Sequence, residues 1–148
     1  MEKIQKIPYI CGPLTDLPIE DHERIKGFYS RLGDACQEAI GVRAFVPHEH
    51  CDPIAFAHLT PTEIDRIERT QVCERTSILI AVYIAPSWGS GIEVEMARQS
   101  GVPIIILCPI GKKISRLLSG NPGVKKILYY ETATNAIYLI RCNLFTLK

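Results

Sequence analysis

The alternation of short apolar runs with longer amphipathic segments is the feature that most constrains the fold of this 148-residue chain. Five apolar runs of strand length occupy residues 6–12, 42–47, 77–84, 103–109 and 125–130. Helical segments are predicted between and after them, at residues 19–41, 60–76, from about 90 to 101, 112–119 and 133–145. A β-α alternation of this kind is typical of a parallel sheet with helices on both faces.

Local signals support two of these helices. In residues 19–41 the apolar side chains recur at three- and four-residue spacing, and Gly41 closes the segment. In residues 60–76, Thr60 is the expected N-cap, Pro61 takes the first helical position, and Glu63 completes a capping box. We therefore expect one α/β domain over residues 1–148, with a flavodoxin-like (Rossmann-like) three-layer fold. Its five parallel strands are expected in the order 2-1-3-4-5.

Composition indicates which binding partners and which cellular location to expect for the protein. Hydrophobic residues make up 47% of the chain, which is enough for a sizeable core, and the formal net charge of +1 argues against nucleic acid and anionic membranes as partners. The apolar runs are too short to span a bilayer, and the first ten residues lack a signal-peptide pattern. The six cysteines form no CxxC pair, which favours a reduced, cytoplasmic protein.

The expected fold also predicts where a ligand binds. In such sheets, ligands lie beyond the carboxyl ends of the strands, at the switch point between the first and third strands. Two Gly- and Pro-rich turns emerge there, "CGPLTDLP" at residues 11–18 and "APSWGSG" at residues 85–91. The second turn leads into Glu93, which admits two interpretations. Glu93 could form a capping box with Ser90, or it could be a catalytic carboxylate at the mouth of the site.

Other residues near these turns are candidates for ligand contacts. Backbone amides of the 85–91 turn could hold an anion or sugar hydroxyls. Trp88, the only tryptophan, could stack on a planar ligand or simply pack at the sheet edge. His48, His50, Cys51 and His58 form a local cluster, but their spacing matches no familiar zinc pattern, so we expect no metal and instead a polar loop in which His48 or His50 contacts ligand.

Three motifs carry a resemblance to a known family. The start "PYICGPLTDLP", the loop "PSWGSGIE" and the helix-strand run "EMARQSGVPIIIL" resemble the nucleoside 2-deoxyribosyltransferase-like superfamily, which includes 2′-deoxynucleoside 5′-monophosphate N-hydrolases. The resemblance spans nearly the whole chain. It implies an enzyme that cleaves or transfers at the N-glycosidic bond of a nucleoside or nucleotide, without a cofactor, as a homodimer or larger homo-oligomer.

The resemblance also implies roles for individual residues. Glu93 matches the nucleophile that attacks C1′, and Tyr9 matches a tyrosine that orients it. Ser115 matches a serine that reaches into the neighbouring subunit's site. Ser87 matches a serine near the sugar or its phosphate. The other residues that we expect to bind substrate belong to the two turns or lie near them: Gly12, Pro13, Trp88, Gly89, Ser90, Gly91 and His48.

The chain departs from the family pattern at several positions. Arg69 stands where the family has an aspartate that serves the leaving base, so Asp65 or Glu68 is expected to replace it, with Asp65 better oriented. Ser77 replaces a second aspartate. Pro13 and Thr15 replace a serine and an arginine that grip phosphate, which favours an unphosphorylated substrate.

Two other functions fit the same sequence. A non-catalytic nucleoside or nucleotide sensor is suggested by the aspartate missing at Arg69. A phosphoribohydrolase of the lysine-decarboxylase-like type shares a Gly-rich turn before a catalytic glutamate, although its loop is usually a fuller PGGxGTxxE.

Overall fold

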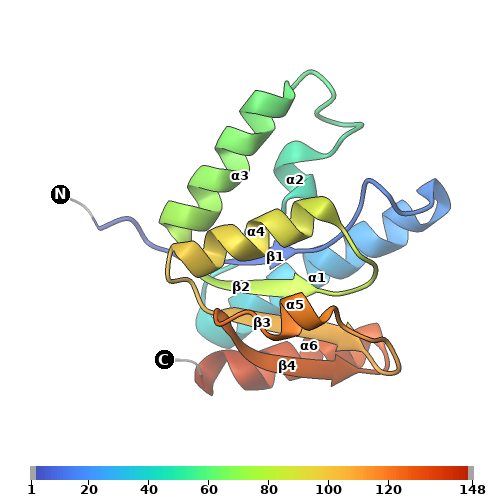
Figure 1. Ribbon diagram of the computed structural model, residues 1–148, viewed down its shortest axis with the longest axis vertical. Coiled ribbons are helices and arrows are strands. Elements are labelled where there is room, and N and C mark those ends of the chain that lie inside the picture. Colours follow the sequence, from blue (N-terminus) through green and yellow to red (C-terminus); the bar gives the residue numbers. More distant parts are fainter. Residues whose placement is uncertain (1–2, 147–148) are drawn as a thin grey trace.

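The computed structural model of the chain describes residues 3–146 and contains a four-stranded parallel sheet (Figure 1). The strands are β1 (Ile7–Cys11), β2 (Thr76–Val82), β3 (Ile104–Pro109) and β4 (Val124–Tyr130), and they lie in the order β1-β2-β3-β4. Each neighbouring pair is parallel. The expected α/β architecture with a parallel sheet is therefore confirmed.

The predicted fifth strand at residues 42–47 is wrong, and so is the order 2-1-3-4-5. This segment runs along the free edge of β1 but pairs there through one bridge only, between Phe45 and Tyr9. The Phe45 N–H donates to the Pro8 carbonyl at 2.8 Å, and the Ile10 N–H donates to the Phe45 carbonyl at 3.0 Å. Helix α2 (His48–Cys51) begins directly afterwards, so the chain leaves the sheet before a ladder can form.

Helices cover both faces of the sheet (Figure 1). On one face lie α1 (His22–Ile40) and α6 (Ala133–Asn143), with the short 3-10 turns η1 (Ile19–Asp21) and η2 (Leu144–Thr146) at their ends. On the other face lie α3 (Pro61–Arg75), α4 (Trp88–Gln99) and the single turn α5 (Arg116–Ser119). Within residues 3–146 no helix has the length and hydropathy of a membrane span.

The core lies on both sides of the central strands. Residues 104–108 of β3 are all completely buried, which explains the unbroken apolar run in the sequence. Ile105 and Leu107 pack toward α1 and α6, whereas Ile104 and Ile106 pack toward α3 and α4. Each such side chain contributes about 1.5–3 kcal/mol when it is fully buried, so the central strands give a rigid base for the loops that follow them.

The predicted helix ends are confirmed for α1 and α3. Gly41 ends α1 in the left-handed conformation, with φ of 75°, which glycine adopts without steric cost. Thr60 and Glu63 form the predicted capping box at the start of α3. The Glu63 N–H donates to Thr60 Oγ1 at 3.2 Å, and the Thr60 N–H donates to Glu63 Oε2 at 2.7 Å.

Candidate active site

Helix α4 begins three residues earlier than a Ser90–Glu93 capping box requires. Its N-cap is Ser87, whose extended backbone places the hydroxyl oxygen 3.4 Å from the Ser90 N–H that donates to it. Glu93 consequently lies in the second turn, too far along the helix to cap it. The capping interpretation of Glu93 is wrong, and its carboxylate is free to make tertiary contacts.

The Glu93 carboxylate is buried between α4 and β1, with the residue only 7% exposed. Tyr9, in the middle of β1, donates its hydroxyl hydrogen to Glu93 Oε1 at 2.5 Å. The ring of Tyr9 is in turn stacked on Phe45, with centroids 5.4 Å apart and planes 9° from parallel. The structure thus brings together the two residues that the family motifs placed in the site, although 84 positions separate them in the chain.

A second carboxyl group, that of Glu68 in α3, lines the same cavity as Glu93. Burial and then the charge of Glu93 raise the pKa of Glu68 to about 7. Burial also raises the pKa of Glu93, while hydrogen bonds from Cys11, Tyr9 and Glu68 act in the opposite direction. The half-buried Glu68 is therefore partly protonated near neutral pH, beside a buried carboxyl group whose pKa is also raised.

Donors from neighbouring elements, rather than the helix dipole, support a charge on Glu93. The dipole acts mainly within the first turn of a helix, and Glu93 lies beyond it. The N-terminus of α4 is therefore not the main support for a charge on this carboxylate. Burial and the Glu93 charge raise the pKa of Tyr9 well above its usual value, so its hydroxyl stays protonated and remains a donor.

Glu93 opens into a cavity of about 270 Å³ at the carboxyl end of β1. The wall includes seven residues that were candidates from the sequence: Gly12, His48, Glu68, Ser87, Gly89, Ser90 and Glu93. It also includes residues that the sequence analysis did not assign to the site: Ile10, Leu14, Thr15, Asp16, Tyr29, Pro47, Cys51, Pro53 and Ile64. Tyr29 could not be assigned to the site from the sequence, because it reaches Gly12 only through the packing of α1 on β1.

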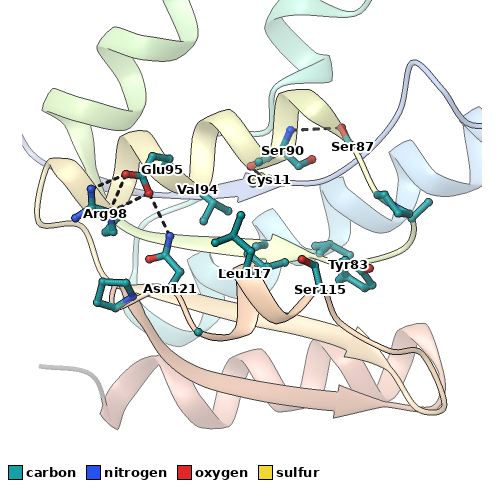
Figure 2. A pocket seen from close by; sticks show the side chains of 18 residues that line it. Cys11, Tyr83, Ser87, Ser90, Val94, Glu95, Arg98, Ser115, Leu117 and Asn121 are labelled. Atoms are coloured by element: carbon teal, nitrogen blue, oxygen red, sulfur yellow. Dashed lines mark hydrogen bonds and ion pairs between the residues drawn. The ribbon is translucent and has the colours of Figure 1, made fainter.

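A larger cavity of about 660 Å³ lies on the other side of the first turn of α4, between α4 and α5 (Figure 2). Ser87 and Ser90 line both cavities, whereas Gly91 and Ser115 line only the larger one. Glu93 is not part of this second wall, whose charged and polar side chains include Glu95, Arg98 and Asn121.

The other residues that the sequence suggested for the site lie outside the Glu93 cavity. Trp88 is 89% exposed, and Pro13 is buried with its carbonyl accepting the Tyr29 hydroxyl at 2.6 Å. Asp65 lies on the exposed face of α3, where it forms a bidentate ion pair with Arg69 at 2.9 Å. Asp65 does not line either cavity, whereas its neighbour Glu68 faces Glu93.

The histidine-rich loop serves packing and hydrogen bonding. His50 stacks on Phe45 with centroids 4.3 Å apart, and His48 Nε2 lies 3.3 Å from Ser30 Oγ. Burial lowers the pKa of His48, so the ring is neutral at pH 7. Across residues 3–146, no three His, Cys, Asp or Glu side chains are grouped so that they could hold a metal ion.

Comparison with solved structures supports the fold that the sequence motifs predicted. No model of a known protein family matches the chain, and no curated protein does. The structure is nevertheless similar to a CMP N-glycosidase of Clostridium botulinum, BcmB, with a TM-score of 0.66, 17% identity, and coverage of 93% of this chain and 99% of that one.

Two further structures extend the likeness. A 2-deoxyribosyltransferase of Bacillus psychrosaccharolyticus matches with a TM-score of 0.52 and 13% identity over 88% of this chain and 89% of that one. A conserved protein of Enterococcus faecalis matches with a TM-score of 0.56 and 16% identity over 91% and 87%. The chain therefore has the fold of nucleoside 2-deoxyribosyltransferase-like proteins, and the predicted resemblance is confirmed at the level of the fold.

Proposed function

We propose that this protein is an enzyme that breaks the N-glycosidic bond of a nucleoside, with Glu93 as the nucleophile. The observation that carries the proposal is a pair of carboxyl groups at one cavity, buried Glu93 and half-buried Glu68, of which Glu93 accepts the Tyr9 hydroxyl hydrogen at 2.5 Å. Paired carboxyl groups with separated roles are the usual equipment for glycoside cleavage. The fold shared with an N-glycosidase and a deoxyribosyltransferase agrees with this chemistry.

The proposed reaction has two steps. Glu93 attacks C1′ of the sugar, a new C–O bond forms, and the bond from C1′ to the base nitrogen breaks with its electron pair going to the base. Glu68 donates its proton to the departing base and becomes a carboxylate. A water molecule then attacks C1′ and gives a proton back to Glu68, which frees Glu93. A second base in place of water would make the protein a transferase.

Glu68, rather than Asp65, is proposed as the acid for the leaving base. A general acid needs a pKa near the working pH, and Glu68 with a pKa of about 7 meets this condition. The pKa of Asp65 is lowered instead, through its hydrogen bond from Arg69. Glu68 therefore supplies the proton that the family draws from the aspartate at the position of Arg69.

The charges around the cavity favour a substrate without a phosphate group. Three acidic side chains line it, those of Asp16, Glu68 and Glu93, and the described residues of its wall include neither lysine nor arginine. A phosphate carrying close to two negative charges would meet repulsion there rather than pairing. The same argument weighs against a phosphoribohydrolase, and it distinguishes this site from one built for a nucleotide such as CMP.

We also propose that the protein works as a homodimer or larger homo-oligomer. Ser115 is exposed at the rim of the larger cavity, beside the first turn of α4, which leaves this face open to a second copy. Sedimentation equilibrium would measure the mass of the particle directly. A particle with the mass of one chain at assay concentration would contradict this part of the proposal.

Chromatographic detection of free base tests the function. Purified protein would be incubated with ribonucleosides, deoxynucleosides and their 5′-monophosphates, with and without a second base, beside Glu93→Gln. We expect base release from an unphosphorylated nucleoside by the wild type and not by the variant. Tight nucleoside binding without any base release would instead support a sensor, and release confined to monophosphates would overturn the substrate assignment.

A further inference from the structure

The turn between β1 and η1 carries an acidic side chain that the proposed reaction does not use, that of Asp16. Thr15 and Asp16 are the central residues of this turn, which the Leu17 N–H closes by donating to the Leu14 carbonyl at 3.0 Å. Asp16 lines the Glu93 cavity and is also exposed to solvent. It therefore lies at the mouth of the cavity, where a ligand can reach it.

Hydrogen bonds hold this turn in place at both ends. The buried Tyr29 hydroxyl donates to the Pro13 carbonyl at 2.6 Å. The His22 ring donates its Nε2 hydrogen to the Leu17 carbonyl at 2.9 Å. Figure 1 shows the segment between β1 and η1 extending past the carboxyl end of β1. Because the turn is fixed at two points, Asp16 is placed before a ligand arrives, and binding does not have to order the turn.

The Asp16 carboxylate keeps its acceptor oxygens available to a ligand. In the described residues, 3–146, Asp21 pairs with Arg24 at 3.0 Å, whereas no hydrogen bond or ion pair engages Asp16. An ionised carboxylate accepts hydrogen bonds and cannot donate one. The ligand group that suits this position therefore carries a hydrogen-bond donor, and the group that it opposes carries negative charge.

We propose that Asp16 is a specificity-determining residue of the Glu93 cavity, where it accepts a hydrogen bond from a hydroxyl of the sugar and repels a phosphate at the same place. The inference rests on the proposed function, which puts C1′ of the sugar at Glu93 and the departing base at Glu68. The 3′ and 5′ hydroxyls of a nucleoside lie on the side of the sugar away from the base. They are therefore the groups that extend toward a third wall of the cavity.

The charge of Asp16 decides between two opposing influences on a phosphate. The first turn of α4 lines the same cavity through Ser87, Gly89 and Ser90, and the positive end of a helix attracts a phosphate. The described part of the wall has no basic side chain that would strengthen this attraction. A carboxylate at the mouth opposes the attraction, whereas a basic side chain at the same position would add to it.

Binding to the Glu93→Gln protein tests the role of Asp16 without catalysis. Isothermal titration calorimetry would measure Kd for adenosine, guanosine, cytidine, uridine and thymidine, and for the 5′-monophosphate of each. We expect a nucleoside to bind more tightly than its monophosphate. Asp16→Asn should reduce this preference about threefold to tenfold, and Asp16→Lys should reduce it further or reverse it, because a negative charge is removed and then replaced by a positive one.

Glu20→Lys is the matched control for the change of charge. Glu20 is exposed in η1, four residues after Asp16, and lines neither of the two cavities. Its replacement changes the net charge as much as Asp16→Lys does, without a contact to the ligand. A preference that stays unchanged in Asp16→Lys, or that changes as much in Glu20→Lys, would overturn the proposal.

Deoxy analogues of the nucleoside test the hydrogen bond itself. With Asp16 present, either the 3′-deoxy or the 5′-deoxy analogue should bind about tenfold more weakly than the nucleoside, and Asp16→Ala should remove that difference. A difference of the same size in Asp16→Ala would overturn the hydroxyl contact.

Failure of the proposed function gives a different result from failure of this inference. Nucleoside binding with a preference that depends on Asp16, but without base release by the wild type, would overturn the proposed function alone. Base release that requires Glu93, with a preference that does not depend on Asp16, would overturn the role of Asp16 alone. If none of the five nucleosides binds, both are overturned.

Discussion

Replacing Glu68 by glutamine should stabilise the protein at alkaline pH and, at the same time, lower its activity. Burial and the neighbouring Glu93 raise the pKa of Glu68 from 4.5 to about 7. A carboxyl group whose pKa is raised by folding binds its proton more tightly in the folded state. Its contribution to stability is therefore complete below the unfolded pKa and is lost as the pH rises through the folded pKa.

The size of the stabilisation follows from the difference between the pKa of Glu68 in the folded and the unfolded protein. The gap between about 7 and 4.5 is about 2.5 pKa units, or an upper limit of about 3.4 kcal/mol at 1.36 kcal/mol per unit. Glu68 is only partly buried, so solvent screening reduces this to about 1–2 kcal/mol. Glutamine keeps the size of the side chain and carries no charge. At about pH 8 the variant should gain this amount, which is roughly 2–8 °C in Tm, and near pH 4 it should gain nothing.

Urea unfolding of both proteins across this pH range measures the difference. Glu95→Gln is the matched control on α4, because the pKa of Glu95 is lowered by its hydrogen bonds from Arg98 and its loss should give no gain at high pH. Base release should fall in Glu68→Gln and not in Glu95→Gln. Parallel stability curves for the wild type and Glu68→Gln would refute the coupling between Glu68 and Glu93.

Two further substitutions probe contacts in and next to the wall of the Glu93 cavity. Asp52→Asn should cost about 2 kcal/mol at neutral pH, because Asp52 is buried, pairs with Lys26 and accepts two backbone amide hydrogens. Burial opposes ionisation of Asp52, but these hydrogen bonds outweigh it and lower its pKa to about 2, so the wild-type advantage, followed by urea unfolding, should vanish as the pH falls from about 4 to about 2. Gly12→Ala should reduce base release and cost about 1–3 kcal/mol, since a Cβ there would overlap the Tyr29 hydroxyl in the cavity wall. Wild-type stability in either variant would contradict these contacts.

The capping motifs show which helix starts can be predicted from a local sequence pattern and which cannot. The pattern of Ser or Thr followed three residues later by Glu occurs at Thr60–Glu63 and again at Ser90–Glu93. Pro61 fixes the first as a true capping box. The second is not one, because Ser87 caps α4 first and moves Glu93 into the next turn. Local pattern alone cannot choose between two competing caps, since the choice depends on where the preceding loop leaves the sheet.

Strands β2 and β3 were predictable, because a strand that is buried on both faces has an unbroken run of apolar residues. The segment at residues 42–47 carries the same signal but is limited to one bridge, because α2 begins at once. For the site, Tyr9 and Glu93 were identifiable from their motifs. That Glu68 rather than Asp65 lines the Glu93 cavity was not predictable, because the rotation of α3 about its axis relative to β1 is set by packing and not by helical spacing.

Whether Glu93 is the nucleophile is decided by looking for a covalent bond between Glu93 and the sugar during turnover. Protein mixed with an excess of a nucleoside that it cleaves would be quenched in acid within one turnover, digested, and analysed by peptide mass spectrometry. We expect a sugar attached to the peptide that contains Glu93 in the wild type, and none in Glu93→Gln. A sugar on another residue, or full base release by Glu93→Gln, would contradict it.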